Sequence, residues 1–142
     1  MTKVSFYKLA GEQPMAMALI CQLAQKAIAQ HQQVLCLVPD KQAVTQLDEY
    51  MWNLNESTFI PHGTGVDQAP IAISCDPEPG NLHQILVNLT TEIPTWFSRF
   101  ERVIEIIYQD VVYEEAKRTH FRFYKERGYP LSFHDLSESF TG

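Results

Sequence analysis

The stretch Val34–Val38, with the sequence VLCLV, decides the fold class together with Pro39 and Asp40, which follow it. Five consecutive apolar residues without polar alternation are typical of a parallel strand whose two faces are both covered by helices. Pro39 ends this strand, and Asp40 is a favourable N-cap for a helix that we expect to run to about Leu54. A buried strand that leads directly into a helix predicts an α/β domain.

The sequence on either side of this stretch alternates helices with strands. Helices are predicted over residues 15–30, 41–54, 94–100 and 111–127, and strands over residues 4–9, 34–38, 71–74, 82–89 and 103–108, with an ordered loop over residues 55–68. This order predicts a three-layer α/β/α fold with a mostly parallel sheet, Rossmann-like but without a nucleotide-binding loop. We expect a single α/β domain over residues 1–131 and a loosely ordered C-terminal tail over residues 132–142.

The composition is that of an ordinary folded domain, with 45% hydrophobic and 11% aromatic residues in a chain of 142. A formal net charge of -6 disfavours nucleic-acid binding by the whole surface, because affinity for phosphates grows with the number of cations presented. The cysteines Cys21, Cys36 and Cys75 lie in or beside apolar runs and predict buried thiols in a reducing compartment. No apolar run approaches the length of a membrane span, so we expect a cytoplasmic protein.

The sequence contains no recognisable catalytic motif. The segment Ala10–Pro14 after the first predicted strand lacks a glycine-rich phosphate loop, and the glycine pair Gly63 and Gly65 does not lie between a strand and a helix. Five histidines are scattered without the spacing of metal ligands: His31, His62, His83, His120 and His134. We therefore expect a binding protein without catalytic residues, cofactor or metal site.

A basic helix is predicted near the end of the chain, where five of the 11 Lys and Arg residues lie between Lys117 and Arg127. At ~100° per residue, one side should face the core. The residues expected on that side are Val112, Tyr113, Ala116, His120, Phe123 and Tyr124. The basic stripe, which we define as Arg118, Arg122 and Lys125, lies opposite, flanked by Phe121 and Val111. This pattern indicates a site for an acidic and apolar ligand, although a solvated charged face is the ordinary alternative.

A second candidate surface follows the helix over residues 41–54. Trp52 points away from the apolar face of this helix, and the apolar loop with Phe59 and Ile60 comes soon after it. Tryptophan is enriched at binding hot spots, so an exposed Trp52 and Phe59 would indicate a permanent partner. The alternative is that Phe59 and Ile60 cover the edge of the sheet and Trp52 packs beneath them.

Several short segments are more specific than the fold requires. In chain order they are Val4–Tyr7, Leu47–Glu49 with Trp52, Phe59–His62, Arg102–Tyr108 and, after the basic helix, Arg127–Tyr129. In this order and spacing they resemble the chi subunit family of bacterial DNA polymerase III. The resemblance covers most of the chain, and its least matched part is Gly63–Pro79.

This resemblance implies a non-catalytic accessory subunit of the clamp loader that reaches nucleic acid only indirectly. It implies two partners, the psi subunit and the acidic C-terminal tail of single-stranded-DNA-binding protein. The tail site would comprise Val111, Lys117, Arg118, Phe121, Arg122 and Lys125. The psi site would comprise Trp52, Phe59, Pro61 and His62. One departure is Glu114, which stands where family members can carry a lysine.

Two other functions are weighed against this one. The first is a small α/β enzyme with an unrecognised active site in the loop Gly63–Asp76. The second is direct binding of single-stranded DNA by the basic stripe, which needs aromatic stacking platforms along a cationic groove. Only Phe121 is clearly available for stacking, and the net charge is unfavourable.

Overall fold

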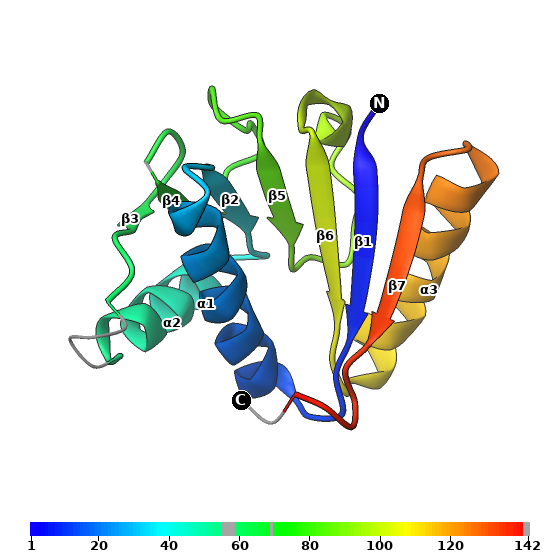
Figure 1. Ribbon diagram of the computed structural model, residues 1–142, viewed down its shortest axis with the longest axis horizontal. Coiled ribbons are helices and arrows are strands. Elements are labelled where there is room, and N and C mark those ends of the chain that lie inside the picture. The colour runs from blue at the N-terminus through cyan, green and yellow to red at the C-terminus, as the bar shows by residue number, and fades with distance from the viewer. Residues whose placement is uncertain (55–58, 69, 141–142) are drawn as a thin grey trace.

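A parallel sheet of seven strands organises the chain in the computed structural model, which describes residues 1–54, 59–68 and 70–140 (Figure 1). The strand order is β3-β4-β2-β5-β6-β1-β7. The strands are β1 (Lys3–Lys8), β2 (Val34–Leu37), β3 (Gly63–Thr64), β4 (Ile71–Ser74), β5 (Ile85–Asn88), β6 (Arg102–Ile107) and β7 (Leu131–Asp135). The helices are α1 (Gln13–Ala29), α2 (Lys41–Trp52), α3 (Val111–Glu126) and the short 3-10 helix η2 (Phe97–Arg99).

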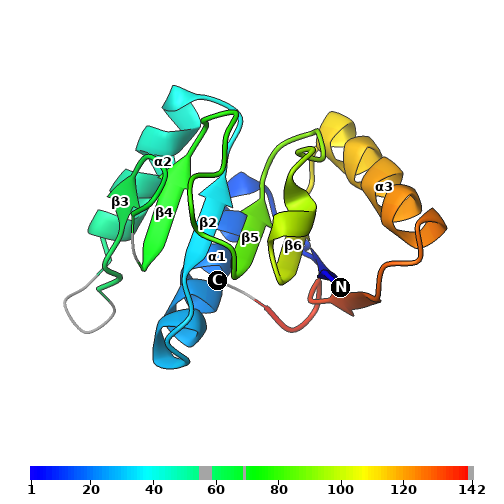
Figure 2. The ribbon, with the colours of Figure 1, turned by 90° about the horizontal axis from the view of Figure 1, so that it is seen from above.

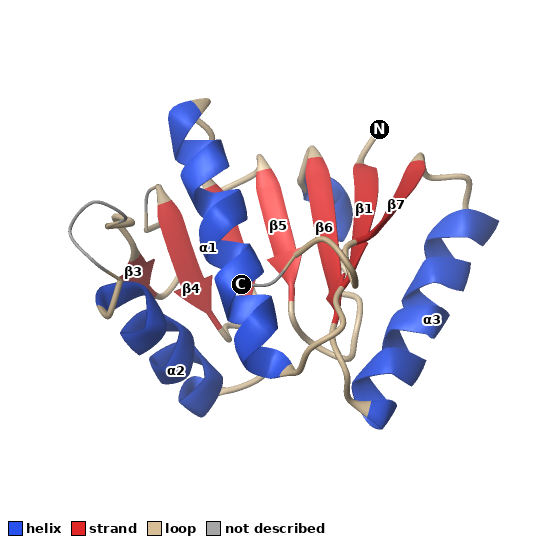
Figure 3. Ribbon diagram, turned by 60° about the horizontal axis from the view of Figure 1, so that its bottom comes forward, coloured by secondary structure: helices blue, strands red, loops and turns tan. Residues whose placement is uncertain are grey.

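Helices cover both faces of the sheet, which confirms the predicted three-layer fold. One face packs against α1 and α2, which lie in front of the sheet in Figure 3. The other face packs against α3 and η2, and Figure 2 shows α1 and α3 on opposite sides of the sheet. Each face has its own apolar core, because side chains alternate between the two faces along every strand.

The central strand β2 shows why this arrangement is stable. Val34 and Cys36 join the core under α1, whereas Leu35 and Leu37 join the core on the opposite face. All four residues are buried, as the continuous apolar run predicted. The predicted cap of α2 is also present, since the Asp40 carboxylate accepts a hydrogen bond of 2.8 Å from the Ala43 amide.

The largest error of prediction concerns the C-terminal tail. The segment expected to be loose from residue 132 begins as an ordered strand, because Leu131–Asp135 pairs in parallel with β1 along the register Val4↔Leu131 to Lys8↔Asp135. Without this pairing the backbone donors and acceptors along one side of β1 would lack partners. The exposed side chains of β7 gave little apolar signal, because an edge strand buries less surface than a central one.

Three smaller differences concern element boundaries. The predicted loop over residues 55–68 contains the short edge strand β3, which pairs with β4, and its residues 55–58 lie outside the described residues. The predicted strand over residues 82–89 is shorter, at Ile85–Asn88. The predicted helix over residues 94–100 is a single 3-10 turn at Phe97–Arg99. Within the described ranges, no helix combines the length and the apolarity that crossing a membrane requires.

Candidate functional site

The basic helix α3 is anchored to the sheet by one buried side. The Asp110 carboxylate caps its start by accepting a hydrogen bond of 2.9 Å from the Tyr113 amide, and Gly128 follows its end with a positive φ of 77°. The buried residues recur at helical spacing: Tyr113, Lys117, His120 and Tyr124. Val112, which was expected to face the core, is 73% exposed, because the buried side is centred on Tyr113, Lys117 and Tyr124 and Val112 lies ~100° around the helix from Tyr113.

The position of Lys117 departs most clearly from the predicted tail site. Its side chain is fully buried, and its ammonium lies 2.6 Å from Glu105 Oε1 of β6 and donates a hydrogen bond of 2.9 Å to the Asn88 carbonyl. Lys117 was expected to offer an exposed charge to the acidic tail, but this charge is neutralised inside the protein. The available sequence signal was Glu105 itself, because an acid within the apolar strand V-I-E-I-I requires a buried partner.

The carboxylate of Glu105 is the centre of a buried polar cluster. It accepts hydrogen bonds from Asn88 Nδ2 at 3.1 Å and Tyr124 Oη at 3.2 Å, and His120 Nδ1 lies 3.1 Å away. Burial alone would raise the pKa of Glu105, but the charge of Lys117 and the contacts of His120 hold this pKa below its ordinary value. The cluster is closed to solvent and holds α3 on the sheet. The prediction that His120 lies on the core side of the helix is therefore confirmed.

Beside this cluster, one flank of α3 forms a groove with the edge strand β7. We define the α3–β7 groove by its lining residues: Phe6, Ile107, Lys117, Arg118, Phe121, Arg122 and Phe133. Its volume is about 490 Å³. Phe121 packs edge-on against Phe6 with 5.2 Å between ring centroids, so it is half-buried rather than free. The guanidinium groups of Arg118 and Arg122 are exposed beside this apolar surface.

The structure adds Phe133 to the groove and separates two expected members from it. Phe133 is 51% exposed, and its ring lies 6.3 Å from the Phe121 ring, edge to face. Sequence reasoning missed Phe133 because the segment was assigned to a loose tail. Val111, which is 85% exposed, and Lys125 lie toward opposite ends of α3, roughly 21 Å apart at ~1.5 Å per residue. Neither of these two residues lines the groove.

The second predicted surface is an aromatic patch, which we define as Trp52, Phe59 and Pro61. Trp52 is 59% exposed and Phe59 is 48% exposed, with 5.5 Å between their ring centroids. Pro61 is exposed beside them, whereas Ile60 is fully buried in the core under α2. The alternative in which Trp52 packs beneath the loop is therefore wrong, since Ile60 is the residue that covers the sheet edge.

His62 supports this patch from below. Its side chain is fully buried, with Nδ1 at 2.6 Å from the Ile60 carbonyl and Nε2 at 3.0 Å from Asp48 Oδ1 on α2. Its ring also packs against Trp52, with 5.1 Å between centroids. His62 was expected to contact psi, but its buried ring instead fixes the loop to the helix. These contacts explain why Asp48, Trp52 and the Phe59–His62 segment occur together in the sequence.

The carboxyl ends of the strands, where open α/β sheets often bind nucleotides, carry a hollow of about 500 Å³ beyond β2, β4 and β5. Asp76 and Glu92 line it, and no Lys, Arg or His is among its described lining residues. Two carboxylates without a cation disfavour phosphate binding. Across the described ranges, no group of three or more His, Cys, Asp or Glu residues could hold a metal ion.

Comparison with known proteins agrees with the segments quoted from the sequence. Residues 1–132 match the family described as "DNA polymerase III chi subunit, HolC". The chain belongs to this family. The fold and the site residues described above are therefore those of a chi-family protein.

The curated relatives carry the same name. The DNA polymerase III subunit chi of Pseudomonas aeruginosa is 37% identical over 139 residues, which cover 96% of this chain and 98% of that protein. The subunits of Escherichia coli and Haemophilus influenzae are 22% and 25% identical and cover 80% and 79% of this chain. These names support an accessory subunit of the replicative polymerase.

A solved structure reported as "The crystal structure of T4 UvsW" resembles the fold, with a TM-score of 0.70 over 96% of this chain and 8% sequence identity. This chain spans 42% of that chain. At this identity the likeness concerns the fold alone.

Proposed function

We propose that this chi-family protein is a non-catalytic accessory subunit of the bacterial replicative DNA polymerase. It would bridge the clamp loader, through the psi subunit, to the acidic C-terminal tail of single-stranded-DNA-binding protein. The observation that carries this proposal is the α3–β7 groove, where the guanidinium groups of Arg118 and Arg122 lie beside the rings of Phe121 and Phe133.

The chemistry of the groove suits a peptide that ends in an aromatic residue and a free carboxylate. The aromatic side chain would pack between Phe121 and Phe133, and the terminal carboxylate would pair with Arg118 or Arg122. Arginine is suited to this task because its planar guanidinium can make two parallel hydrogen bonds to a carboxylate. Arg118 is already 3.3 Å from Glu115 Oε2, so the peptide would have to compete with this exposed ion pair.

A synthetic peptide of sequence DDDIPF tests this part of the proposal by calorimetry. We expect affinity in the micromolar range that falls with added salt, because exposed charge pairs contribute only ~0.2–1 kcal/mol each and are screened. Arg118→Ala should weaken binding by up to about fivefold, which is what ~1 kcal/mol corresponds to. Arg99→Ala is the matched control, because Arg99 is exposed on η2 away from the groove lining. Equal binding of the peptide without its terminal Phe would refute the assignment.

The aromatic patch of Trp52, Phe59 and Pro61 is the proposed contact for psi. The rings of Trp52 and Phe59 lie against each other and are half-exposed, which gives a partner an aromatic anchor of the kind that contributes ~2–4 kcal/mol at interfaces. Tethering to the clamp loader through this patch leaves the α3–β7 groove free, since the patch follows α2 at the opposite end of the sheet.

Co-expression with psi followed by size exclusion tests the second surface. We expect Trp52→Ala and Phe59→Ala each to abolish co-elution, while affinity for the DDDIPF peptide stays within about twofold because the sites share no residue. Val112→Ala is a suitable control, since Val112 is exposed but lies on α3. Retention of the psi complex by the folded double variant would place psi elsewhere.

A further inference from the structure

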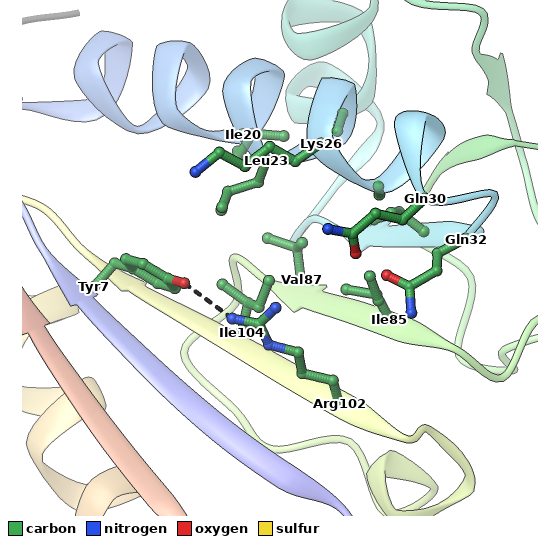
Figure 4. A pocket seen from close by; sticks show the side chains of 13 residues that line it. Tyr7, Ile20, Leu23, Lys26, Gln30, Gln32, Ile85, Val87, Arg102 and Ile104 are labelled. Atoms are coloured by element: carbon green, nitrogen blue, oxygen red, sulfur yellow. Dashed lines mark hydrogen bonds between the residues drawn. The ribbon is translucent and has the colours of Figure 1, made fainter.

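A pocket of about 150 Å³ lies between α1 and the sheet, on the face opposite to the α3–β7 groove (Figure 4). Its floor is apolar and is formed by Ile85, Val87 and Ile104, while Ile20 and Leu23 of α1 cover it. Cavities of about this size hold a benzene ring when their walls are apolar. The pocket is therefore large enough for the body of a small organic molecule.

The rim of this α1–β6 pocket carries an arginine that no acid among the described residues neutralises. Arg102 Nη2 donates hydrogen bonds to Tyr7 Oη at 2.9 Å and to Ser5 Oγ at 3.4 Å. Both acceptors are neutral hydroxyls, and Arg102 forms no ion pair with any carboxylate in the described part of the chain. Because guanidinium has five N–H donors and these bonds both leave from Nη2, the group retains donors for a ligand.

The remaining polar side chains described below are also either cationic or neutral. Lys26 lines it from the last turns of α1, and the side chains of Gln30 and Gln32 point into the gap between helix and sheet (Figure 4). No Asp or Glu is among its described lining residues, although the chain as a whole has 17 acids against 11 Lys and Arg. Two cations without a carboxylate make this a positively charged cavity in an acidic protein.

These observations distinguish the pocket from an ordinary gap under a helix. A charged group that is partly removed from water is stabilised by an opposite charge, and Arg102 is half-buried without an acidic partner in the described part of the chain. The Tyr7 hydroxyl accepts from Arg102, so its own hydrogen is available to a second acceptor. The carboxyl end of α1 lies nearby and its dipole opposes an anion, which limits the affinity.

We propose that the α1–β6 pocket binds a small organic anion. Its apolar body, about the size of a benzene ring, lies on Ile85, Val87 and Ile104. Its carboxylate or phosphate accepts hydrogen bonds from Arg102 and Lys26. This site is independent of the proposed polymerase role, because it lies on the other face of the sheet from the α3–β7 groove.

Amide chemical shifts of the full chain, followed by NMR during titration with benzoate, phenyl phosphate and benzyl alcohol, test the proposal. We expect the two anions to shift amides of residues 23–32 and 85–87 with millimolar affinity, and benzyl alcohol to bind about tenfold more weakly. Tighter binding of phenyl phosphate would identify a phosphate ligand, and tighter binding of benzoate a carboxylate. Absence of shifts with both anions, or equal binding of the neutral alcohol, would overturn the proposal.

Charge-removing variants locate the anion. Arg102→Gln should weaken benzoate binding about tenfold and Lys26→Gln about threefold, whereas Arg99→Gln is the matched control with binding unchanged. Arg118→Gln in the α3–β7 groove should also leave benzoate binding unchanged, so failure here and failure of the tail site are separable. If Arg102→Gln does not fold, the proposal is still tested by benzoate binding to Lys26→Gln, which changes an exposed residue, and by the comparison of benzoate with benzyl alcohol. Wild-type affinity in both folded pocket variants would contradict the assignment.

Discussion

Replacing Lys117 by methionine should destabilise the protein more than its position on a charged helix suggests. At 2.6 Å and an effective dielectric constant of ~20, the attraction between the Lys117 ammonium and Glu105 Oε1 is about 6 kcal/mol. Removing two ions from water costs several kcal/mol each, so the intact pair adds little net stability. Lys117→Met keeps most of the side-chain volume but leaves a buried carboxylate without its cation, which costs about 3–5 kcal/mol.

Urea unfolding at pH 7 measures this loss. With a slope of about 2 kcal/mol/M, the midpoint of Lys117→Met should fall by roughly 1.5–2.5 M urea. The matched control is Lys125→Met on the same helix, where the exposed side chain should change the free energy of unfolding by less than about 0.5 kcal/mol. A free energy of unfolding for Lys117→Met that lies within about 1 kcal/mol of the wild-type value would refute the reasoning, because surface substitutions alone cause changes of this order.

The same variant should change how stability depends on pH. In the wild type the pKa of Glu105 is lowered from 4.5, so its contribution is fully present above that value and is lost as pH falls through the lower folded pKa. Without Lys117, burial is the main remaining influence and raises the pKa of Glu105, so the folded variant binds the extra proton. The difference in unfolding free energy between wild type and variant should therefore shrink from pH 7 to pH 4, and a constant difference would contradict the assignment.

Glu115→Gln should raise affinity for the DDDIPF peptide about two- to threefold in calorimetry, because it frees Arg118 from an exposed ion pair; an unchanged affinity would mean that Arg118 does not contact the peptide. Phe133→Ala should weaken the same peptide about fivefold or more with the melting temperature nearly unchanged, and an unaffected affinity would remove β7 from the site. Burial raises the pKa of Cys36 to about 12, so Ellman's reagent at pH 8 should modify Cys75 rapidly and Cys36 only after unfolding; rapid reaction of Cys36 would contradict its burial.

The parts of the fold that bury much apolar surface could be predicted from the sequence. The run Val34–Val38 identified a central parallel strand because burial on both faces requires a continuous apolar sequence. Asp40 identified the start of α2 because an N-cap bonds to an amide only three residues later. The exposure of Trp52 followed from its angle on a regular helix in the same way. The strand β7 could not be found by this reasoning, since it buries little surface and exists because β1 offers an unpaired edge more than 100 residues earlier.

The candidate sites were predicted less completely, because polar side chains were assumed to be exposed on the basis of their residue type. Lys117 and His62 were assigned to binding surfaces, yet Glu105 and Asp48 hold them inside the protein. A helical wheel places Lys117 beside Tyr113 and Tyr124, but it contains no information on the acid of another strand. Phe133 was missed because it contacts Phe121 once β7 pairs with β1, and this long-range pairing was not predicted.

The position of β1 between β6 and β7 has a consequence for the order in which the two surfaces form during synthesis. Strand β1 leaves the ribosome long before its partner β6, which lies about a hundred residues downstream, as the pair Lys3↔Arg102 shows, whereas β2, β4 and β5 with α2 follow one another closely. Pairing over such a span is slow because a long loop must close first. We therefore expect the aromatic patch to be complete in the nascent chain before the α3–β7 groove, so that the partner proposed for Trp52 could bind before the groove exists.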